Sequence, residues 1–367
     1  MKRWLYEIIT GVRVGFIPSM ILALLIPLSL LYGLACVIRR WLYEAGLLRG
    51  KRLPLPIVCI GNIVAGGAGK TSLTIYLAGL LASRGIRPVI ICSGYGGRSK
   101  STLIVSDGER ITADVETAGD EAYMLAERML RGRVPVIAGR DRFEAGMIAL
   151  SRFKPDLLLL DDGFQHLKLS RDLDLVVVDG ARPFGTGRLL PVGTLREPPS
   201  ALRSADLIIL MDSDLSEKEI GKLSGGKPLF KAKRVPSHLR WIGGKDRIDL
   251  KELQGKKILA VCSIGNPLSF EKILSDLGCQ VHLLDFPDHH LYSRKDLRVI
   301  EEMEREFDLI VTTAKDEPKL LRLGFKGGLV LEIDLEVDPQ PLESLIFPLI
   351  SPLSPRRASA TPRPRQG

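Results

Sequence analysis

A glycine-rich segment that ends in lysine and threonine, GGAGKT at residues 66–71, has the composition of a phosphate-binding loop. It lies between an expected strand and an expected helix, where glycines let backbone N–H groups approach phosphate oxygens. We expect Lys70 to reach the β- and γ-phosphates of a nucleotide and the Thr71 hydroxyl to contact Mg²⁺. Val64 replaces the first glycine of the strict pattern, so the loop is a variant, and the alternative is a tight turn with an incidental Lys-Thr pair. The expected nucleotide-binding residues are Gly66, Gly67, Ala68, Gly69, Lys70, Thr71 and Ser72.

Two adjacent carboxylates follow an apolar run further along the chain. Asp161 comes directly after four leucines, as expected of the metal-binding acid of a nucleotide-hydrolysing or phosphate-transferring site. Its neighbour Asp162 would repel it unless a cation lies between them. An isolated Asp-Asp pair after a strand serves as often to cap a helix. Downstream of a phosphate-binding loop, we interpret the pair as a metal site.

Three further pairs of polar residues carry weaker signals. Asp120 and Glu121 open an expected helix, where acids cap the helix and complement its dipole, and composition alone favours capping. His289 and His290 lie in a turn, and spacing alone favours a solvated pair. Arg196 and Glu197 follow the Gly/Pro-rich segment FGTGRLLPVG, a kind of loop that often carries function.

The elements that must position these residues form two alternations of strands and helices. Apolar runs without polar alternation favour a parallel sheet covered by helices on both faces. In the first alternation we expect strands at 57–62, 88–96, 135–139, 156–163, 174–180 and 205–213, and helices at 70–84, 120–131 and 143–153. In the second we expect strands at 256–264, 279–287 and 308–316, and helices at 268–277 and 294–307.

The expected fold class is therefore α/β: a P-loop NTPase-like parallel-sheet domain, a second, smaller α/β domain and an N-terminal membrane-associated helix. The mixed, turn-rich composition near 227–244 suggests a linker or hairpin between the domains, and the last residues are rich in Pro, Arg and Ser. The expected ranges are an anchor with a basic flank at 1–50, the nucleotide-binding domain at 51–230, the smaller domain with its linker hairpin at 231–353, and a disordered tail at 354–367.

The segment 14–38 contains 25 residues without a charge. As a helix it would be about 37 Å long, enough to cross a bilayer core of about 30 Å. Aromatic residues flank it on both sides and a basic cluster follows it, which favours a cytosolic location for the next domain. A cleaved signal peptide and a buried core helix are the alternatives, and the signal peptide fits badly because the run is long and leads into basic residues.

The net charge of +9 is concentrated at the two ends of the chain. Residues 1–52 carry +6 and residues 352–367 carry +4, which leaves about −1 for the body between them. A nucleic-acid-binding face on that body is therefore not expected, whereas the basic flank suits anionic lipid headgroups. The five cysteines are scattered, so no disulfide framework or Cys metal site is indicated, and a reducing cytosol is the expected compartment.

Several motifs together resemble the tetraacyldisaccharide 4′-kinase family, the lipid A 4′-kinases. They are GNIVAGGAGKT, GDE, the block DDGFQHLKLSRDLDLVVVDGARPFGTGRLLPVGTLREP at 161–198, FPDHH and TTAKDEPKL. The similarity covers the chain from the apolar segment to about Leu353, and DDGFQH with the downstream LREP is its most specific part.

The resemblance implies an ATP- and Mg²⁺-dependent lipid kinase on the cytoplasmic face of the bacterial inner membrane. Its substrate would be a tetraacylated glucosamine disaccharide 1-phosphate, phosphorylated on the 4′-hydroxyl, and it implies no nucleic acid and no obligate protein partner. By the same resemblance, Asp120 is the catalytic base, assisted by His289 from the second domain, and the two meet only when the domains close. Glu121, Asp161, Asp162 and Glu197 would hold Mg²⁺ directly or through water, and Gln165, His166 and Arg196 would line the phosphate-transfer region.

Four positions depart from the family pattern. Ser72, Ala122 and Thr186 replace Pro, Pro and Asn, and Ser93 stands where an Arg is expected, a role that Arg98 could take over. Two other functions compete with the lipid kinase. A membrane-bound P-loop ATPase switch of the partitioning type would carry a Lys at the position of Ala65. A P-loop enzyme acting on a soluble small molecule leaves the apolar segment unexplained.

Overall fold

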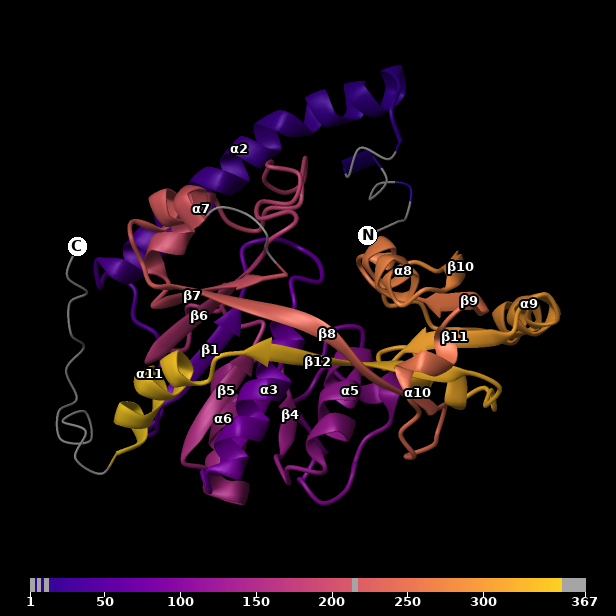
Figure 1. Ribbon diagram of the computed structural model, residues 1–367. Coiled ribbons are helices and arrows are strands. Elements are labelled where there is room, and N and C mark those ends of the chain that lie inside the picture. Colours follow the sequence, from indigo (N-terminus) through magenta and orange to yellow (C-terminus); the bar gives the residue numbers. More distant parts are fainter. Residues whose placement is uncertain (1–3, 5–7, 10–12, 213–216, 352–367) are drawn as a thin grey trace. The chain divides into compact units, whose positions relative to one another are not determined.

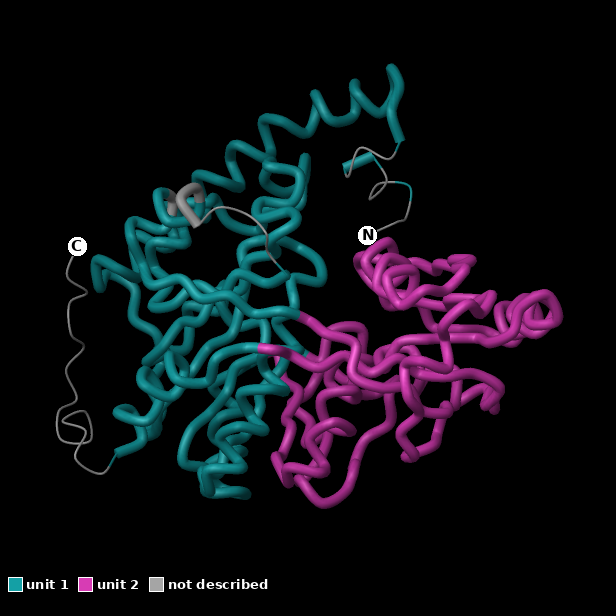
Figure 2. The backbone as a smooth tube through the Cα atoms, in the orientation of Figure 1, with its two compact units in different colours: residues 1–93, 141–233, 337–367 teal, residues 94–140, 234–336 magenta. Residues whose placement is uncertain are grey.

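The chain divides into two compact units in a computed structural model that describes residue 4, residues 8–9, residues 13–212 and residues 217–351. Unit 1 comprises residues 1–93, 141–233 and 337–367, and unit 2 comprises residues 94–140 and 234–336 (Figure 2). Neither unit is continuous in sequence. The long strand β8 (Leu229–Trp241) begins in unit 1 and ends in unit 2.

Unit 1 contains a parallel sheet with the strand order β8-β7-β6-β1-β5-β2. Apart from Asp161 at the end of β5, the strands β1, β5 and β7 consist of apolar residues and glycine. All their residues are buried, because helices cover a parallel sheet on both faces. The remaining strands of this sheet are β1 (Ile57–Gly61), β2 (Pro88–Cys92), β5 (Leu157–Asp161), β6 (Leu173–Asp179) and β7 (Leu207–Met211). The helical elements of the unit are α2 (Phe16–Glu44), α3 (Lys70–Ser83), α6 (Arg142–Phe153), η1 (Pro199–Ser204), α7 (Glu217–Ser224) and α11 (Gln340–Ile350) (Figure 1).

Unit 2 contains a parallel arrangement in the order β10-β9-β11-β12 and an antiparallel pair, β3 with β4. Alternate residues of β9 point into two separate apolar clusters, Ile258 and Ala260 into one and Leu259 and Val261 into the other. The strands are β3 (Leu103–Ser106), β4 (Val136–Ala138), β9 (Lys257–Cys262), β10 (Gln280–Asp285), β11 (Leu309–Thr313) and β12 (Leu329–Val337). The helices are α4 (Val115–Ala118), α5 (Asp120–Met129), η2 (Leu250–Leu253), α8 (Pro267–Asp276), α9 (Arg294–Glu304) and α10 (Glu317–Leu321).

The division differs from the expected continuous ranges in two segments. The end of the expected smaller domain, from residue 337 on and with α11, belongs to unit 1. Residues 94–140, with β3, β4, α4 and α5, belong to the unit formed by the C-terminal half and not to the nucleotide-binding half. The contacts of α5 with α10 are one reason, since they join this segment to residues more than 180 positions later. The region expected as a linker or hairpin is the 13-residue strand β8, which passes from unit 1 into unit 2. The tail at 354–367 lies outside the described residues.

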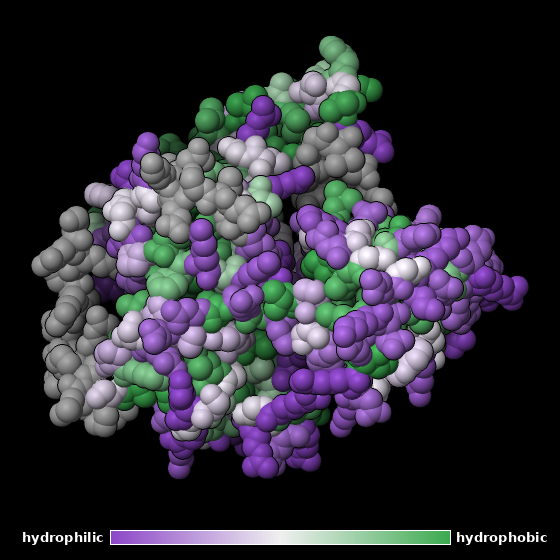
Figure 3. Space-filling model, in the orientation of Figure 1, coloured by the Kyte–Doolittle hydropathy of each residue, from purple (hydrophilic) through white to green (hydrophobic). Residues whose placement is uncertain are grey.

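The apolar segment forms the single long helix α2, with Pro27 inside it. Only 11% of its most apolar window is buried, so a buried core helix does not describe it. It is long and apolar enough to cross a membrane by length and composition. Hydrophobic surface follows this helix in Figure 3.

Candidate active site

The phosphate-binding loop joins β1 to α3 in unit 1. Gly66 and Gly69 have φ of 125° and 89°, values that favour glycine, and Gly69 caps the N-terminus of α3. A Cβ atom added at Gly66 or Gly67 would meet nothing within 4 Å, so the space above this part of the loop is open. The first turn of α3 therefore offers backbone N–H groups and a favourable dipole to an anion.

Lys70 is the first residue of α3 and is buried. Its Nζ lies 3.5 Å from the Gly66 carbonyl oxygen and 3.5 Å from Asp162 Oδ1. Arg196 Nη1 donates to both carboxylate oxygens of Asp162, at 3.0 and 2.8 Å. Burial would raise the pKa of Asp162, but Lys70 and Arg196 lower it to about 2. Asp162 thus balances the two cations that the sequence assigned to phosphate.

Asp161 ends β5 and pairs in register with Ile60 of β1, which places it beside the loop. It is 3% exposed, and its Oδ1 accepts a hydrogen bond of 2.8 Å from the hydroxyl of Thr74, one turn after Lys70 on α3. Thr71 adjoins Lys70 at the start of the same helix. Thr71, Asp161 and Asp162 therefore gather at the carboxyl edge of the sheet, as the sequence predicted.

Gln165 and His166 lie in the turn after β5. The Gln165 amide Nε2 donates to the backbone carbonyl of Asn62 at 2.7 Å, which fixes the residue where β1 passes into the phosphate-binding loop. Burial, together with the nearby charges of Arg142 and Arg171, lowers the pKa of His166 to about 4. His166 is therefore neutral near neutral pH. The Gln165 side chain supports the start of the phosphate-binding loop by bonding the Asn62 carbonyl.

Glu197, predicted to hold Mg²⁺ directly or through water, is engaged by an arginine of the N-terminal helix. It is 1% exposed, and its Oε2 accepts hydrogen bonds from Nε and Nη2 of Arg40 on α2, the first of them at 2.8 Å. Burial raises the pKa of Glu197, although Arg40 opposes this shift. The other predicted ligand, Glu121, belongs to unit 2. Among the described residues no three His, Cys, Asp or Glu side chains form a cluster that could hold a metal ion by themselves.

The second group of predicted site residues lies within unit 2. Asp120 begins α5 after Gly119, and its Oδ1 and Oδ2 lie 2.9 and 3.0 Å from Nδ1 of His289. His289 has a left-handed φ of 62°. The ring of Tyr95 packs edge-on against the imidazole, with 5.2 Å between the two ring centroids. Both residues belong to one compact unit, so the expectation that they meet only when two domains close is wrong. His290 instead bonds Asp296 at the start of α9.

Two lysines face this pair. Lys315 Nζ lies 2.9 Å from Asp288, 3.7 Å from Glu121 and 3.8 Å from Asp120. Lys319 is fully buried, and its Nζ lies 3.6 Å from Asp120 Oδ2. Burial would raise the pKa of Asp120, but the hydrogen bond from His289 and the charges of both lysines lower it to about 2. Burial opposes a charge on His289, yet its hydrogen bond to Asp120 raises the pKa of the imidazole. The Asp–His pair is therefore strongly polarised.

Lys319 connects Asp120 to a buried polar network that sequence reasoning assigned no role. Its Nζ donates to Ser263 Oγ at 2.6 Å and pairs with Asp316 at 2.7 Å. Asp316 also accepts from the backbone N–H of Ser263 and from the Thr313 hydroxyl. The signal was present in the motif TTAKDEPKL, which supplies Thr313, Lys315, Asp316 and Lys319.

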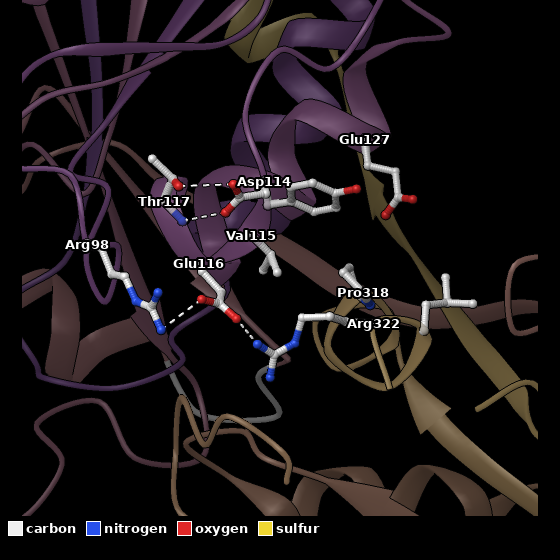
Figure 4. A pocket seen from close by; sticks show the side chains of 10 residues that line it. Arg98, Asp114, Val115, Glu116, Thr117, Glu127, Pro318 and Arg322 are labelled. Atoms are coloured by element: carbon white, nitrogen blue, oxygen red, sulfur yellow. Dashed lines mark hydrogen bonds and ion pairs between the residues drawn. The ribbon is translucent and has the colours of Figure 1, made fainter. Parts of the chain in front are cut away.

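A cavity of about 580 Å³ in unit 2 contains none of the predicted catalytic residues (Figure 4). Glu116 of α4 bridges Arg98 and Arg322 in it, and the Arg98 Nη2 lies 2.8 Å from Glu116. Arg98, considered above as a substitute for the missing Arg at position 93, is thus committed to a carboxylate of its own unit. The lining residues are Arg98, Asp114, Val115, Glu116, Thr117, Tyr123, Glu127, Pro318, Leu321 and Arg322.

Comparison with known proteins identifies relatives that match most of the chain. The family model described as tetraacyldisaccharide-1-P 4′-kinase matches residues 21–350. The tetraacyldisaccharide 4′-kinase of Syntrophus aciditrophicus is 40% identical over 333 residues, covering 85% of this chain and 88% of the relative. That of Geobacter metallireducens is 38% identical over 338 residues, covering 90% and 98%.

A solved structure shares the fold. The crystal structure of "apo" form LpxK from Aquifex aeolicus in complex with ATP has a TM-score of 0.73 and 33% identity, and the match covers 90% of this chain and 100% of that one. The comparisons confirm the resemblance, the α/β fold class and the kinase class predicted from the sequence, and they do not favour a partitioning-type ATPase. The chain belongs to the tetraacyldisaccharide-1-P 4′-kinase family.

Proposed function

We propose that this protein transfers the γ-phosphate of ATP to the 4′-hydroxyl of a tetraacylated glucosamine disaccharide 1-phosphate. The observation that carries the proposal is that one chain of this family holds both halves of the chemistry. Lys70, Asp161 and Asp162 surround a phosphate-binding loop in unit 1, and Asp120 bonds His289 in unit 2. Phosphoryl transfer needs mainly positioning and charge neutralisation, which the first group supplies.

The donor set beside the loop fits Mg²⁺. The Thr71 hydroxyl and the carboxylates of Asp161 and Asp162 are hard oxygen ligands, the type that Mg²⁺ prefers alongside substrate phosphates. When bound, the ion would neutralise charge on the β- and γ-phosphates. Glu197 fits a direct ligand role poorly because Arg40 engages it. For Glu121 we keep the proposal of a ligand that holds the ion directly or through water.

Asp120 and His289 are proposed to receive the hydroxyl proton as a unit. A sugar hydroxyl is a poor nucleophile near neutral pH, and an isolated Asp carboxylate is a weak base. Lys315, Lys319 and His289 keep the Asp120 carboxylate ionised and oriented. Sharing the proton between carboxylate and imidazole strengthens the base, as in a catalytic triad, where a third group orients the second.

Membrane association is proposed to rest on α2 and the basic residues near it. The helix presents an apolar surface, and Arg39 and Arg49 add positive charge for anionic lipids. We place the protein on the cytoplasmic face of the bacterial inner membrane, where its lipid substrate and ATP are both within reach.

The test of the activity is transfer of labelled γ-phosphate from ATP to the lipid disaccharide 1-phosphate, compared with ATP hydrolysis without acceptor. We expect acceptor-dependent labelling that Lys70→Met reduces by more than tenfold in kcat/KM, about 1.4 kcal/mol or more of transition-state stabilisation. The control is Lys222→Met, which removes an exposed lysine from α7 and should retain wild-type activity. Hydrolysis that is indifferent to the lipid would point to an ATPase instead.

The test of the base is a double-mutant cycle between Asp120→Ala and His289→Ala. Each single change should lower kcat by roughly 10²–10⁴-fold, the usual contribution of general-base catalysis. Because the two residues act as a unit, the double variant should lose little more than the worse single variant. His290→Ala is the matched control, since its ring bonds Asp296, and should be much milder. Losses that multiply would mean independent roles, with His289 then binding substrate.

A further inference from the structure

We propose that Arg40, on the N-terminal apolar helix, is a positioning residue for phosphoryl transfer. Its ion pair with Glu197 fixes the loop that carries Arg196, and this loop in turn positions the phosphate-binding loop. The inference rests on the proposed kinase activity. It assigns α2 a second task beside membrane association: the helix is part of the structure that shapes the nucleotide site.

The ion pair itself is built for a fixed geometry. Arg40 is 8% exposed and Glu197 1% exposed, and two guanidinium nitrogens of Arg40 donate to the same carboxylate oxygen. The guanidinium also lies 4.5 Å from the ring centroid of Phe164, which is fully buried in the turn that follows Asp161 and Asp162. Arg39 Nη2 lies 3.6 Å from the other carboxylate oxygen of Glu197, but the Arg39 side chain is 45% exposed. Arg40 is therefore the buried partner of Glu197, and a buried carboxylate that loses such a partner is strongly unfavourable.

Glu197 belongs to a loop that is hydrogen-bonded to the phosphate-binding loop. The backbone N–H of Arg196 donates to the Ile63 carbonyl at 2.8 Å, and that of Ala65 donates to the Thr194 carbonyl at 2.7 Å. The side chain of Arg196 meanwhile holds Asp162, which also faces Lys70. A displacement of Glu197 therefore also moves its neighbour Arg196, which orders both the phosphate-binding loop and the carboxylate of Asp162.

Helix α2 contacts the same loop at successive turns. Ser29 Oγ donates to the Leu189 carbonyl at 2.9 Å, and the Tyr32 hydroxyl donates to the Arg196 carbonyl at 2.7 Å. Gly33 lies so close to Leu189 that a Cβ atom there would be 2.6 Å from Cδ1. A helix that only anchored the chain would need an apolar surface and no such contacts. These bonds end on the backbone of the loop that carries Arg196.

The experiment compares Arg40→Met, Arg40→Lys and Arg49→Met in the full-length protein in detergent micelles. Arg49 is exposed in the same basic flank, so its variant removes an equal charge without touching Glu197. We measure kcat and both KM values with labelled ATP and the lipid disaccharide 1-phosphate, and hydrogen exchange of the amides at 188–197.

We expect Arg40→Met to lower kcat by about a hundredfold, as small misplacements of a catalytic group do, with little change in the KM for lipid. Exchange at 188–197 should accelerate, and sedimentation with vesicles should match that of Arg49→Met. Arg40→Lys should recover part of the activity. If Arg40→Met does not fold, Arg40→Lys decides: wild-type kcat and exchange in that variant would overturn the proposal. So would wild-type behaviour of Arg40→Met. A wild-type protein that does not label the lipid refutes the kinase activity alone, and the exchange at 188–197 then decides the inference.

Discussion

Lys319 carries its charge where solvent does not reach, between the carboxylates of Asp316 and Asp120. Replacing it with Met keeps much of the volume but leaves the buried Asp316 without its cation, and leaves Asp120 with only Lys315 and His289 beside it. We predict that Lys319→Met lowers the free energy of unfolding by about 3 kcal/mol or more, measured by chemical denaturation. Lys315→Met, at a lysine whose side chain is 14% exposed, should cost less stability.

A double-mutant cycle tests whether Lys319 stabilises the protein through its ion pair with Asp316. The double variant Asp316→Asn with Lys319→Met should lose less than the sum of its single variants, because the second change removes a charge that the first left unpaired. Additive losses would mean that Ser263 and Thr313 alone satisfy Asp316, to which both donate hydrogen bonds.

At the scale of elements, the turn from β1 into α3 depends on backbone conformation. Gly69 has a φ of 89°, and a Cβ atom there would also lie 3.0 Å from Cε of Met211. We predict that Gly69→Ala costs about 1–2 kcal/mol of stability and raises the KM for ATP, because the strained residue distorts the start of the helix. Gly79→Ala, inside α3 with open space around it, should instead stabilise by up to about 1 kcal/mol and leave the KM unchanged. Calorimetry and steady-state kinetics check both variants.

The elements that the sequence predicted are those with an uninterrupted apolar pattern. Helix α6 was expected at 143–153 and spans Arg142–Phe153, and β1, β5 and β7 lie within the expected runs. Short β3 was missed, as was β12, half of which alternates between exposed and partly buried residues. Periodicity reports local burial and not the unit to which an element belongs, so it could not place 94–140 with the C-terminal half.

The candidate site likewise contains parts that the sequence could predict and parts that it could not. The loop and Asp161 could be predicted because strand, glycines and helix are contiguous. The contact of Asp120 with His289 joins residues 169 positions apart and was available only from the family resemblance. The partnership of Glu197 with Arg40, 157 positions earlier, had no local signal and could not be predicted from the sequence.

At the scale of the whole molecule, the exposed apolar surface of α2 is the feature most suited to a membrane. Leu24, Leu28 and Leu31 are 70%, 55% and 63% exposed. We predict that changing the three to Ser weakens sedimentation with anionic vesicles and leaves the unfolding transition of the body unchanged. The reason is that these side chains are exposed in the folded protein and would bury apolar area only against lipid. The basic flank should leave a residual, salt-sensitive binding. Unchanged, salt-resistant binding would locate the anchor elsewhere.

The interleaving of the two units sets an order for synthesis on the ribosome. Helix α2 emerges early, whereas unit 1 is completed only by residues that follow all of unit 2. Those late residues contact the helix of the phosphate-binding loop: Tyr76 donates to the Val337 carbonyl, and Arg84 pairs with Glu343 of α11 at 2.9 Å. Chains grow from the N-terminus at a limited rate, so the segment that we propose for the membrane is available well before the nucleotide-binding unit can close. A nascent chain can therefore meet the lipid surface before it can hold ATP.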